Sequence, residues 1–542
     1  MKQPLRWTAL GLTLIVLACT GASTQTAGGA AGEQSPVYGR WRALTQGPLG
    51  MGIVQLDIEP GEDGKPVLIL DGQIRSLVRY PWENAVVTGD GASAEYRILS
   101  YDVAGYSSGT AKLEARLVAG GSMLRVEVTD HHRTVALVFE RDGPKFARFD
   151  SPRLDASGLP ATDYVYAPPA ERTNDGLEVA SLEDVGLRPE LFEDAVRDGI
   201  LKDEYPEITS LLVLKDGKLV FEEYFNGHHA DNLHYQASVS KTWTAMLLGA
   251  ALRDGVLESI EVPVLDLLPD YRGPKWDRPG AEPTVRDFLM MKDIVGWDEG
   301  SASYNSPDND LLKALRTQPD PFRYLFEREL LAPDASRPPS YNTMITHTLG
   351  LILMRKTGKN LLDSMDEQIL QPLKIGRAVW GSWSSTPRPE PEAIPLAGST
   401  LQVRSRDMLK FGQMLLDGGR WQGVQVVPEP WVRESLTLTG IMSPRWGYGY
   451  QTWIIKLDNG ERTLWVARGD GHGGQTINVV PELNAVVVTT SNNYYGDGKL
   501  AGVLVRERIL PAMIGGTRPF DHANLTVEDL GYQTLARAAD QL

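Results

Sequence analysis

The chain has 542 residues, 42% of them hydrophobic and 23% charged, which is the composition of a globular protein with room for two or three domains. Acidic residues outnumber basic ones by 70 to 54, for a formal net charge of −16 at pH 7. Binding to a phosphate backbone needs clustered basic surface. The sequence contains no basic stripe, so nucleic acid is excluded as a partner.

The N-terminus has the pattern of an export signal. Lys2 and Arg6 precede the apolar run TALGLTLIVLA, which has signal-peptide length and is too short to span a bilayer comfortably. The run ends in Val-Leu-Ala-Cys at 16–19, which resembles a bacterial lipobox, where a lipid is attached to the cysteine thiol. Cys19 is the only cysteine, so no internal disulfide can form, and lipidation gives this residue a role.

Residues 1–18 are therefore predicted to be a lipoprotein signal peptide, and the small and polar residues 19–36 a flexible tether. The mature protein would lie on the periplasmic or cell-surface side of a membrane, held by the lipid anchor only. The alternative is a plain signal peptide cut after another small residue such as Ala22.

Residues 37–150 are predicted to form a small antiparallel β domain. Apolar and polar side chains alternate at 111–117, and the same period of two recurs at 124–128 and 135–139, with glycine-containing turns between. Nothing in this segment names a ligand, so docking and the binding of glycan or lipid are both open roles.

The stretch GYSSG at 105–109 matches G-x-S-x-G, the nucleophile elbow of α/β-hydrolases. That motif works only on a strand-to-helix turn, whereas the residues that follow, TAKLEARLV, alternate as a strand. The match is predicted to be a β-turn, and Ser107 is not predicted to be catalytic.

Residues 151–187 are rich in proline, glycine and aspartate without periodicity, and they are predicted to be a linker. Residues 189–201 then have the pattern of a helix with one apolar face. Two apolar runs joined through Asp-Gly predict a hairpin at 208–225.

The pattern is mostly helical over 243–375 and returns to strands near 464–490. Strands on both sides of a helical insert predict an α+β fold, in which distant segments build one antiparallel sheet beside an all-helical lobe. This domain is predicted to span 188–517, followed by a C-terminal tail at 518–542.

The stretch YQASVSKTWTAML at 235–247 raises the question of which serine is functional. On a helix beginning near Ala237, Ser238 and Lys241 are three residues apart and hence neighbours, whereas Ser240 points away from the lysine. The predicted buried face of this helix comprises Trp243, Met246, Leu247, Ala250 and Ala251. Ser238 is therefore the serine with a usable base.

Such a lysine can accept the serine proton only if burial or nearby positive charge keeps it neutral part of the time. The helix N-terminus assists, because its dipole disfavours the ammonium and its N–H groups can hold an oxyanion. S-x-x-K alone is a weak motif, since a capped helix with a solvated lysine would also produce it.

Three stretches, taken together, resemble the serine β-lactamase/penicillin-binding-protein superfamily, in its class C-like and esterase/amidase branch. They are ASVSKTWTAMLLGAALRDGVL, PPSYNTMITHTLGLILMRKTG and RGDGHGGQTINVVPELNAVVV. TVRDFLMMKDIVGW, STLQVRSRDMLKFGQMLLDGG and YGYQTW support them in family order. The resemblance covers about residues 185–517 and is specific as a set. It implies a β-lactamase-like antiparallel sheet flanked by helices and no cofactor, and the run of motifs is most similar to the 6-aminohexanoate-dimer-hydrolase-like group.

The resemblance places Tyr341 at the family's tyrosine. It implies that Ser238 attacks a carbonyl and forms an acyl-enzyme, while Lys241 and Tyr341 share the proton transfers as base and then acid. A tyrosine hydroxyl is a poor base at a pKa of ~10, so it would need the positive charge of the lysine close by.

The family's edge-strand triad corresponds to His472-Gly473-Gly474. The resemblance implies an oxyanion hole made by the backbone N–H groups of Ser238 and Gln475. Gly474 would let the substrate backbone approach the strand closely. His472, at the usual lysine position, would orient the polar end of the substrate.

Two departures shift the predicted substrate. The resemblance places Thr343 among the substrate-binding residues, at the asparagine position of Tyr-x-Asn, where an amide normally holds the side chain of a β-lactam; His472 replaces the usual lysine. Both favour an esterase, amidase or D-amino-acid peptidase over a β-lactamase or D,D-carboxypeptidase. Tyr304, in SASYNSPDND, lies in a predicted lid loop, where it would either contact substrate or anchor the loop.

The competing hypothesis is a non-catalytic sensor of penicillin or muropeptides, which would keep the same residues and fail to deacylate. The predicted partner in either case is a small molecule or peptide, and the sequence does not indicate an oligomeric state. His228, His229 and His234 cluster before the helix without carboxylate or thiol partners at metal-binding spacing, so no metal site is predicted.

Overall fold

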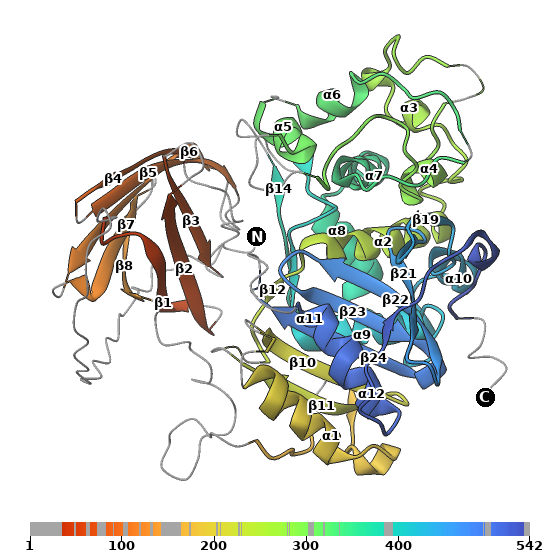
Figure 1. The fold of residues 1–542 in the computed structure, drawn as a ribbon. Helices are drawn as coiled ribbons and strands as arrows, with labels where there is room; N and C mark the ends of the chain where they lie inside the picture. Colours follow the sequence, from red (N-terminus) through yellow and green to blue (C-terminus); the bar gives the residue numbers. More distant parts are fainter. Residues whose placement is uncertain are drawn as a thin grey trace, which may run out of the picture. The chain divides into compact units, whose positions relative to one another are not determined.

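The protein is described here by a computed structural model (Figure 1). The described residues are 35–47, 50–60, 65–72, 83–89, 91–100, 107–118, 121–129, 134–141, 164–172, 175–201, 204–205, 208–225, 228, 230–278, 280, 282–301, 308–317, 320–334, 336–383, 394–491, 493 and 500–535. The chain forms two compact units, one of residues 1–98 and 109–146 and the other of residues 99–108 and 147–542.

The N-terminal unit is an eight-stranded sheet in the order β3-β2-β1-β8-β7-β6-β5-β4 (Figure 1). The strands are β1 (Gly39–Gly47), β2 (Gly50–Pro60), β3 (Pro66–Gly72), β4 (Glu83–Thr88), β5 (Gly91–Ser100), β6 (Ser107–Val118), β7 (Met123–Thr129) and β8 (Thr134–Arg141). Leu113 and Leu124 lie on buried faces of neighbouring strands and pack around Trp41. The predicted small β domain is confirmed. The β-turn predicted at 105–109 is wrong for its described residues, because 107–109 already belong to β6, which pairs with its neighbours in the sheet.

The second unit is built on one large, almost entirely antiparallel sheet, in the order β19-β20-β21-β22-β23-β24-β10-β11-β9, with β25 beside β21. Its strands are β9 (Glu178–Val179), β10 (Ile208–Lys215), β11 (Lys218–Tyr224), β19 (Gly440–Ser443), β20 (Trp446–Tyr448), β21 (Trp453–Asp458), β22 (Thr463–Gly471), β23 (Gln475–Val480), β24 (Ala485–Ser491) and β25 (Asp521–His522). β10 and β11 form the predicted hairpin, whose turn residues Asp216 and Gly217 both have positive φ. β10 also pairs with β24, so distant segments do meet in one sheet.

Helices cover both faces of this sheet (Figure 1). On one face lie α2 (Ser240–Arg253) and α9 (Ser405–Leu416), with α10 (Glu429–Ser435) packed on α2, and on the other lie α1 (Pro189–Asp194), α11 (Ala501–Leu504) and α12 (Leu510–Met513). The helical lobe contains α3 (Val264–Leu267), α4 (Val285–Leu289), α5 (Asp310–Thr317), α6 (Pro321–Phe326), α7 (Thr343–Thr357) and α8 (Leu361–Met365), and α7 packs on α2. α2 is buried along most of its length, and Trp243 stacks on Phe411 of α9 at 3.7 Å.

Short strand pairs complete the second unit. They are β12 (His234–Tyr235), β13 (Val379–Trp380) and β16 (Leu401–Val403) in one sheet, β14 (Ser382–Trp383) with β15 (Ile394–Pro395), and β17 (Arg420–Trp421) with β18 (Val424–Gln425). β12 pairs with β16, which holds the chain just before α2 against the segment around residue 401. Among the described residues, no helix is long and apolar enough to cross a bilayer.

The second unit extends beyond its predicted limits of 188 and 517. Within the predicted linker, Tyr164 and Leu182 are buried in the core, and β9 pairs in parallel with β11. Within the predicted tail, β25 pairs with β21 and Phe520 is buried. The described parts of both segments are therefore integral to the fold, because long-range packing orders stretches that have no periodicity of their own.

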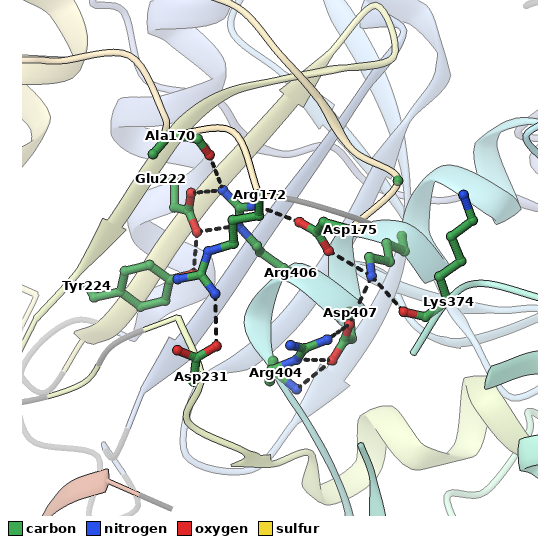
Figure 2. Close-up of polar contacts among 12 residues, drawn as sticks. Ala170, Arg172, Asp175, Glu222, Tyr224, Asp231, Lys374, Arg404, Arg406 and Asp407 are labelled. Atoms are coloured by element: carbon green, nitrogen blue, oxygen red, sulfur yellow. Dashed lines mark hydrogen bonds and ion pairs between the residues drawn. The ribbon is translucent and has the colours of Figure 1, made fainter. Parts of the chain in front are cut away.

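A buried polar network ties Ala170 and Asp175 to the core (Figure 2). Arg406 of α9 is 2% exposed and pairs with Glu222 of β11 at 2.7 Å and with Asp175. Lys410, fully buried, places Nζ 2.9 Å from Asp175 and 3.3 Å from Asp407. With Arg404, which pairs with Asp407 at 2.7 Å, three cations face three carboxylates and the buried charges balance.

Candidate active site

Ser238 lies in the 3₁₀ turn Ala237–Val239 that leads directly into α2. Ala237 has a φ of 44°, a strained value for a residue other than glycine. The Nζ atom of Lys241 is 2.9 Å from the Ser238 hydroxyl, so the two side chains are neighbours. Ser240 is buried instead, and its hydroxyl accepts a hydrogen bond from the backbone N–H of Leu401 at 3.3 Å.

Lys241 is 1% exposed. Burial lowers the pKa of its ammonium from 10.5 to about 7, although the negative charge of Glu299 raises it in part. Its Nζ also donates to the carbonyl of Gly398 at 2.9 Å, which fixes the amine beside Ser238. A lysine with a pKa near 7 is neutral in a large fraction of molecules at neutral pH, as a general base must be.

Tyr341 is the third member of the cluster. The Lys241 amine lies 4.8 Å from the centroid of the Tyr341 ring, and the ring stacks on Trp453 at 5.5 Å. Burial raises the pKa of Tyr341 well above its ordinary value, and the charge of Glu299 adds to the effect, while the neighbouring side chains of Ser238 and Thr343 oppose it. The tyrosine is therefore protonated at neutral pH and is suited to donate a proton.

The end of β22 and the start of β23 pack against the turn that contains Ser238. Close contact requires glycine here, because a Cβ at Gly471 would lie 2.4 Å from the carbonyl oxygen of Gln236. Gly474 has a φ of 98°, and a Cβ there would lie 2.8 Å from the Cβ of Ser491. The predicted triad thus lies at the nucleophile's end of the sheet.

The Gln475 side chain is buried and ties β23 to β24. Its Nε2 donates to the carbonyl of Ser491 at 2.6 Å, and its Oε1 accepts from the Ser491 N–H at 3.1 Å. A role in oxyanion binding therefore rests on the Gln475 backbone N–H. His472 is exposed in the turn between β22 and β23.

Thr343 begins α7, and it is buried. Its backbone N–H donates to Glu299 Oε2 at 2.7 Å, and its hydroxyl donates to Glu299 Oε1. The Thr343 hydroxyl thus faces a carboxylate, whereas the sequence predicts that it faces substrate. The N-cap of α7 is Asn342, whose side chain accepts from the N–H of Ile345 at 3.2 Å.

Glu299 and His347 are not apparent from the sequence as site residues. The Nδ1 atom of His347 accepts a hydrogen bond from the N–H of Gly398 at 3.0 Å, next to the carbonyl that Lys241 contacts. Burial and the Lys241 charge hold the pKa of His347 well below its ordinary value, so its ring is neutral. Glu299 lies outside the motif stretches, and His347 lies within one without a role assigned to it, so only contacts across the fold reveal them.

Three other predictions concern residues around this site. Tyr304, the predicted lid residue, and Cys19, the predicted lipidation site, lie outside the described residues. The His228 and His234 rings lie 5.1 Å apart, and His234 Nε2 is 2.8 Å from the hydroxyl of Thr209. Among the described residues, no group of three or more histidine, cysteine or acidic side chains is placed to hold a metal ion.

The sequence is similar to a known protein family and to a characterised hydrolase. The family model named Beta-lactamase matches residues 207–508, more than half of the chain. The 6-aminohexanoate-dimer hydrolase of Paenarthrobacter ureafaciens is 25% identical over 298 residues, which are 52% of this chain and 72% of that protein.

Solved structures are also similar. The octameric penicillin-binding protein homologue from Pyrococcus abyssi has 19% identity and a TM-score of 0.47, over 61% of this chain and 78% of that one. The D-stereospecific amidohydrolase from Streptomyces sp. has 19% identity and a TM-score of 0.44, over 59% of this chain and 98% of that one.

Proposed function

Because this chain belongs to the Beta-lactamase family, as the family match over 207–508 shows, we propose that it is a serine hydrolase that forms an acyl-enzyme on Ser238 and cleaves an ester or amide. One observation carries the proposal: buried Lys241, with a pKa of about 7, is hydrogen-bonded to the Ser238 hydroxyl at 2.9 Å. This contact supplies what an unactivated hydroxyl lacks, a base in position to take its proton.

In the proposed reaction, neutral Lys241 takes the Ser238 proton as Oγ bonds to the substrate carbonyl carbon, and the carbonyl electron pair moves onto oxygen. The N–H groups of Ser238 and Gln475 would hold that oxyanion. As the intermediate collapses, the bond to the leaving group breaks, and Tyr341 gives its proton to the departing alcohol or amine. The Lys241 ammonium then reprotonates Tyr341, and attack by water on the acyl-enzyme repeats the steps and releases Ser238.

The proposed substrates are open-chain esters or amides, including peptides that contain D-amino acids. The 25% identity to a 6-aminohexanoate-dimer hydrolase supports this class. Thr343 in place of asparagine supports it too, because its hydroxyl is committed to Glu299. We also propose that the protein is an exported lipoprotein anchored through Cys19.

The test is labelling by a fluorophosphonate, read by intact mass. Wild type and the Ser240→Ala variant should each gain one adduct, whereas Ser238→Ala should gain none, because Ser240 is occupied with Leu401. Folded wild type that gains no adduct would contradict the hydrolase proposal. Parallel assays with p-nitrophenyl butyrate, D-amino-acid amides and nitrocefin should show turnover of the first two classes, whereas a burst without turnover would identify a sensor.

A further inference from the structure

Glu299 is a buried carboxylate beside the active site. It is 3% exposed, and its two oxygens accept hydrogen bonds from the described residues Trp297 and Thr343. Oε2 accepts from the Thr343 N–H at 2.7 Å and from the indole N–H of Trp297 at 3.0 Å, while Oε1 accepts the hydroxyl of Thr343. The side chain of Asn309 donates to the Glu299 backbone carbonyl at 3.2 Å, which holds the segment in place.

Short contacts lead from this carboxylate to the nucleophile. Thr343, whose backbone N–H and hydroxyl donate to Glu299, follows Tyr341 by two residues. The Lys241 amine lies 4.8 Å from the centroid of the Tyr341 ring and 2.9 Å from the Ser238 hydroxyl. The carboxylate bound at the start of α7 and the proposed base are therefore linked through Tyr341.

The proposed reaction creates a positive charge in this buried site. When Lys241 takes the Ser238 proton, an ammonium forms where solvent cannot stabilise it, and a buried cation is costly unless a negative group lies near. The neighbouring His347 is neutral and offers no compensation. The carboxylate of Glu299 is the charge that acts favourably on the Lys241 ammonium.

We propose that Glu299 is a positioning residue, which orients Tyr341 through Thr343 and sets the pH range of the reaction by stabilising the ammonium of Lys241. The inference rests on the proposed function of Ser238. It assigns a role to a loop residue outside the motif stretches, and it explains why the Thr343 hydroxyl faces a carboxylate.

The other titratable groups around the site define what a pH profile would report. Tyr341 and Tyr448 are both held protonated by burial, and the Glu299 charge raises the pKa of each. Asp470 also raises the pKa of Tyr341. Removing the charge of Glu299 therefore lowers the pKa of both Lys241 and Tyr341.

The Glu299→Gln variant isolates the charge. Its amide oxygen can still accept from Thr343 N–H and Trp297, and its NH₂ group can donate to the Thr343 hydroxyl. The rate of inactivation by fluorophosphonate should fall in acid, the acid limb of the pH profile, as Lys241 becomes protonated. In Glu299→Gln we expect this fall to occur about 1 pH unit lower, which is the smallest shift typical of removing a nearby opposite charge. Because labelling reports only Ser238 activation, no natural substrate is needed.

Asp310→Asn is the matched control. Asp310 is buried in the same lobe and holds the same loop, since its Oδ2 accepts from the backbone N–H of Asp298 at 2.8 Å. Asp310, unlike Glu299, is not among the charges that raise the pKa of Lys241. We expect Asp310→Asn to leave the acid limb at its wild-type pH, even where the variant is less stable.

A second pair of variants tests the positioning role and serves also if Glu299→Gln does not fold. Thr343→Val removes the hydroxyl and keeps the Glu299 charge, so labelling should slow about tenfold or more with the acid limb in place, while Thr343→Ser should stay near wild type. A Glu299→Gln profile that superimposes on wild type, an equal shift in Asp310→Asn, or a Thr343→Val rate equal to wild type would overturn the inference. Unlabelled wild type would instead contradict the proposed function itself.

Discussion

At the scale of single residues, the backbone of Gly398 shapes the environment of Lys241. Gly398 accepts from Lys241 through its carbonyl and donates to His347 through its N–H. A Cβ at Gly398 would lie 2.9 Å from Cγ2 of Thr343, so only glycine brings this backbone close enough. The amine is therefore held in a dry site by backbone and a neutral ring, and its pKa is low because water is excluded.

The buried amine predicts a specific pH dependence of stability. The unfolded chain binds a proton at Lys241 up to its ordinary pKa of 10.5, whereas the folded chain loses that proton near 7. Between these values the unfolded state binds more protons, so the free energy of unfolding rises with pH. Relative to Lys241→Met, wild type should gain about 3 kcal/mol from pH 7 to pH 10.

Urea denaturation of both proteins at pH 7, 8.5 and 10 measures this difference, and all other titrating groups cancel in the comparison. Parallel curves for wild type and Lys241→Met would show that the lysine keeps an ordinary pKa in the folded protein.

At the scale of elements, the polar network of Figure 2 attaches the chain before β9 to α9 and β11. Hydrogen bonds with Lys410 and Arg406 and the charges of both lower the pKa of Asp175, although its burial acts in the opposite direction. Removal of one partner from such a network leaves an opposite charge buried and unbalanced. The network therefore makes an irregular segment necessary for the stability of the sheet and helix beside it.

Asp175→Asn is expected to lower the free energy of unfolding by about 3–5 kcal/mol at pH 7. Because the folded-state pKa of Asp175 is depressed, its contribution is complete above the ordinary value near 3.8 and is lost as pH falls through the folded value. Urea denaturation at pH 7 and at progressively lower pH should show the two proteins converging in acid.

The control is Asp231→Asn, whose carboxylate is 58% exposed and pairs with Arg172 at 2.8 Å in the same view (Figure 2). An exposed pair contributes at most about 1 kcal/mol. Equal losses in the two variants would show that burial of the network has no special role.

At the scale of the whole molecule, the sequence predicts what depends on local pattern. Alternation predicts the N-terminal sheet, and Asp-Gly between apolar runs predicts the β10–β11 hairpin at 208–225. The spacing of Ser238 and Lys241 on one helix correctly places their side chains together. Each of these inferences needs only neighbours in sequence or a known set of motifs.

What the sequence does not predict depends on contacts between distant segments. Glu299 meets Thr343 across 44 residues, and Lys241 meets Gly398 across 157. No periodicity records such pairs, because a loop glutamate or glycine looks the same whether it is solvated or buried. The sequence does not predict the burial of Tyr164 and Leu182 in the core for the same reason.

Cys19 is predicted to attach the whole protein to a membrane through a lipid. In a bacterial host that exports the protein, wild type should fractionate with membranes and have the mass of residues 19–542 plus a lipid, whereas Cys19→Ser should lack both properties. Detergent partition and intact mass measure this. A mature chain that begins after Ala22 without lipid would establish the plain signal peptide instead.

The packing of Asp175 and β9 has a consequence for how this gene can be recombined. A fragment that encodes only the family match, 207–508, would leave Arg406 and Lys410 without the Asp175 carboxylate and β11 without its parallel partner β9. Exchange or fusion that preserves a folded product must therefore carry the upstream codons from Tyr164 onward. The segment that must be kept together for folding is therefore longer than the segment that matches the family, 207–508.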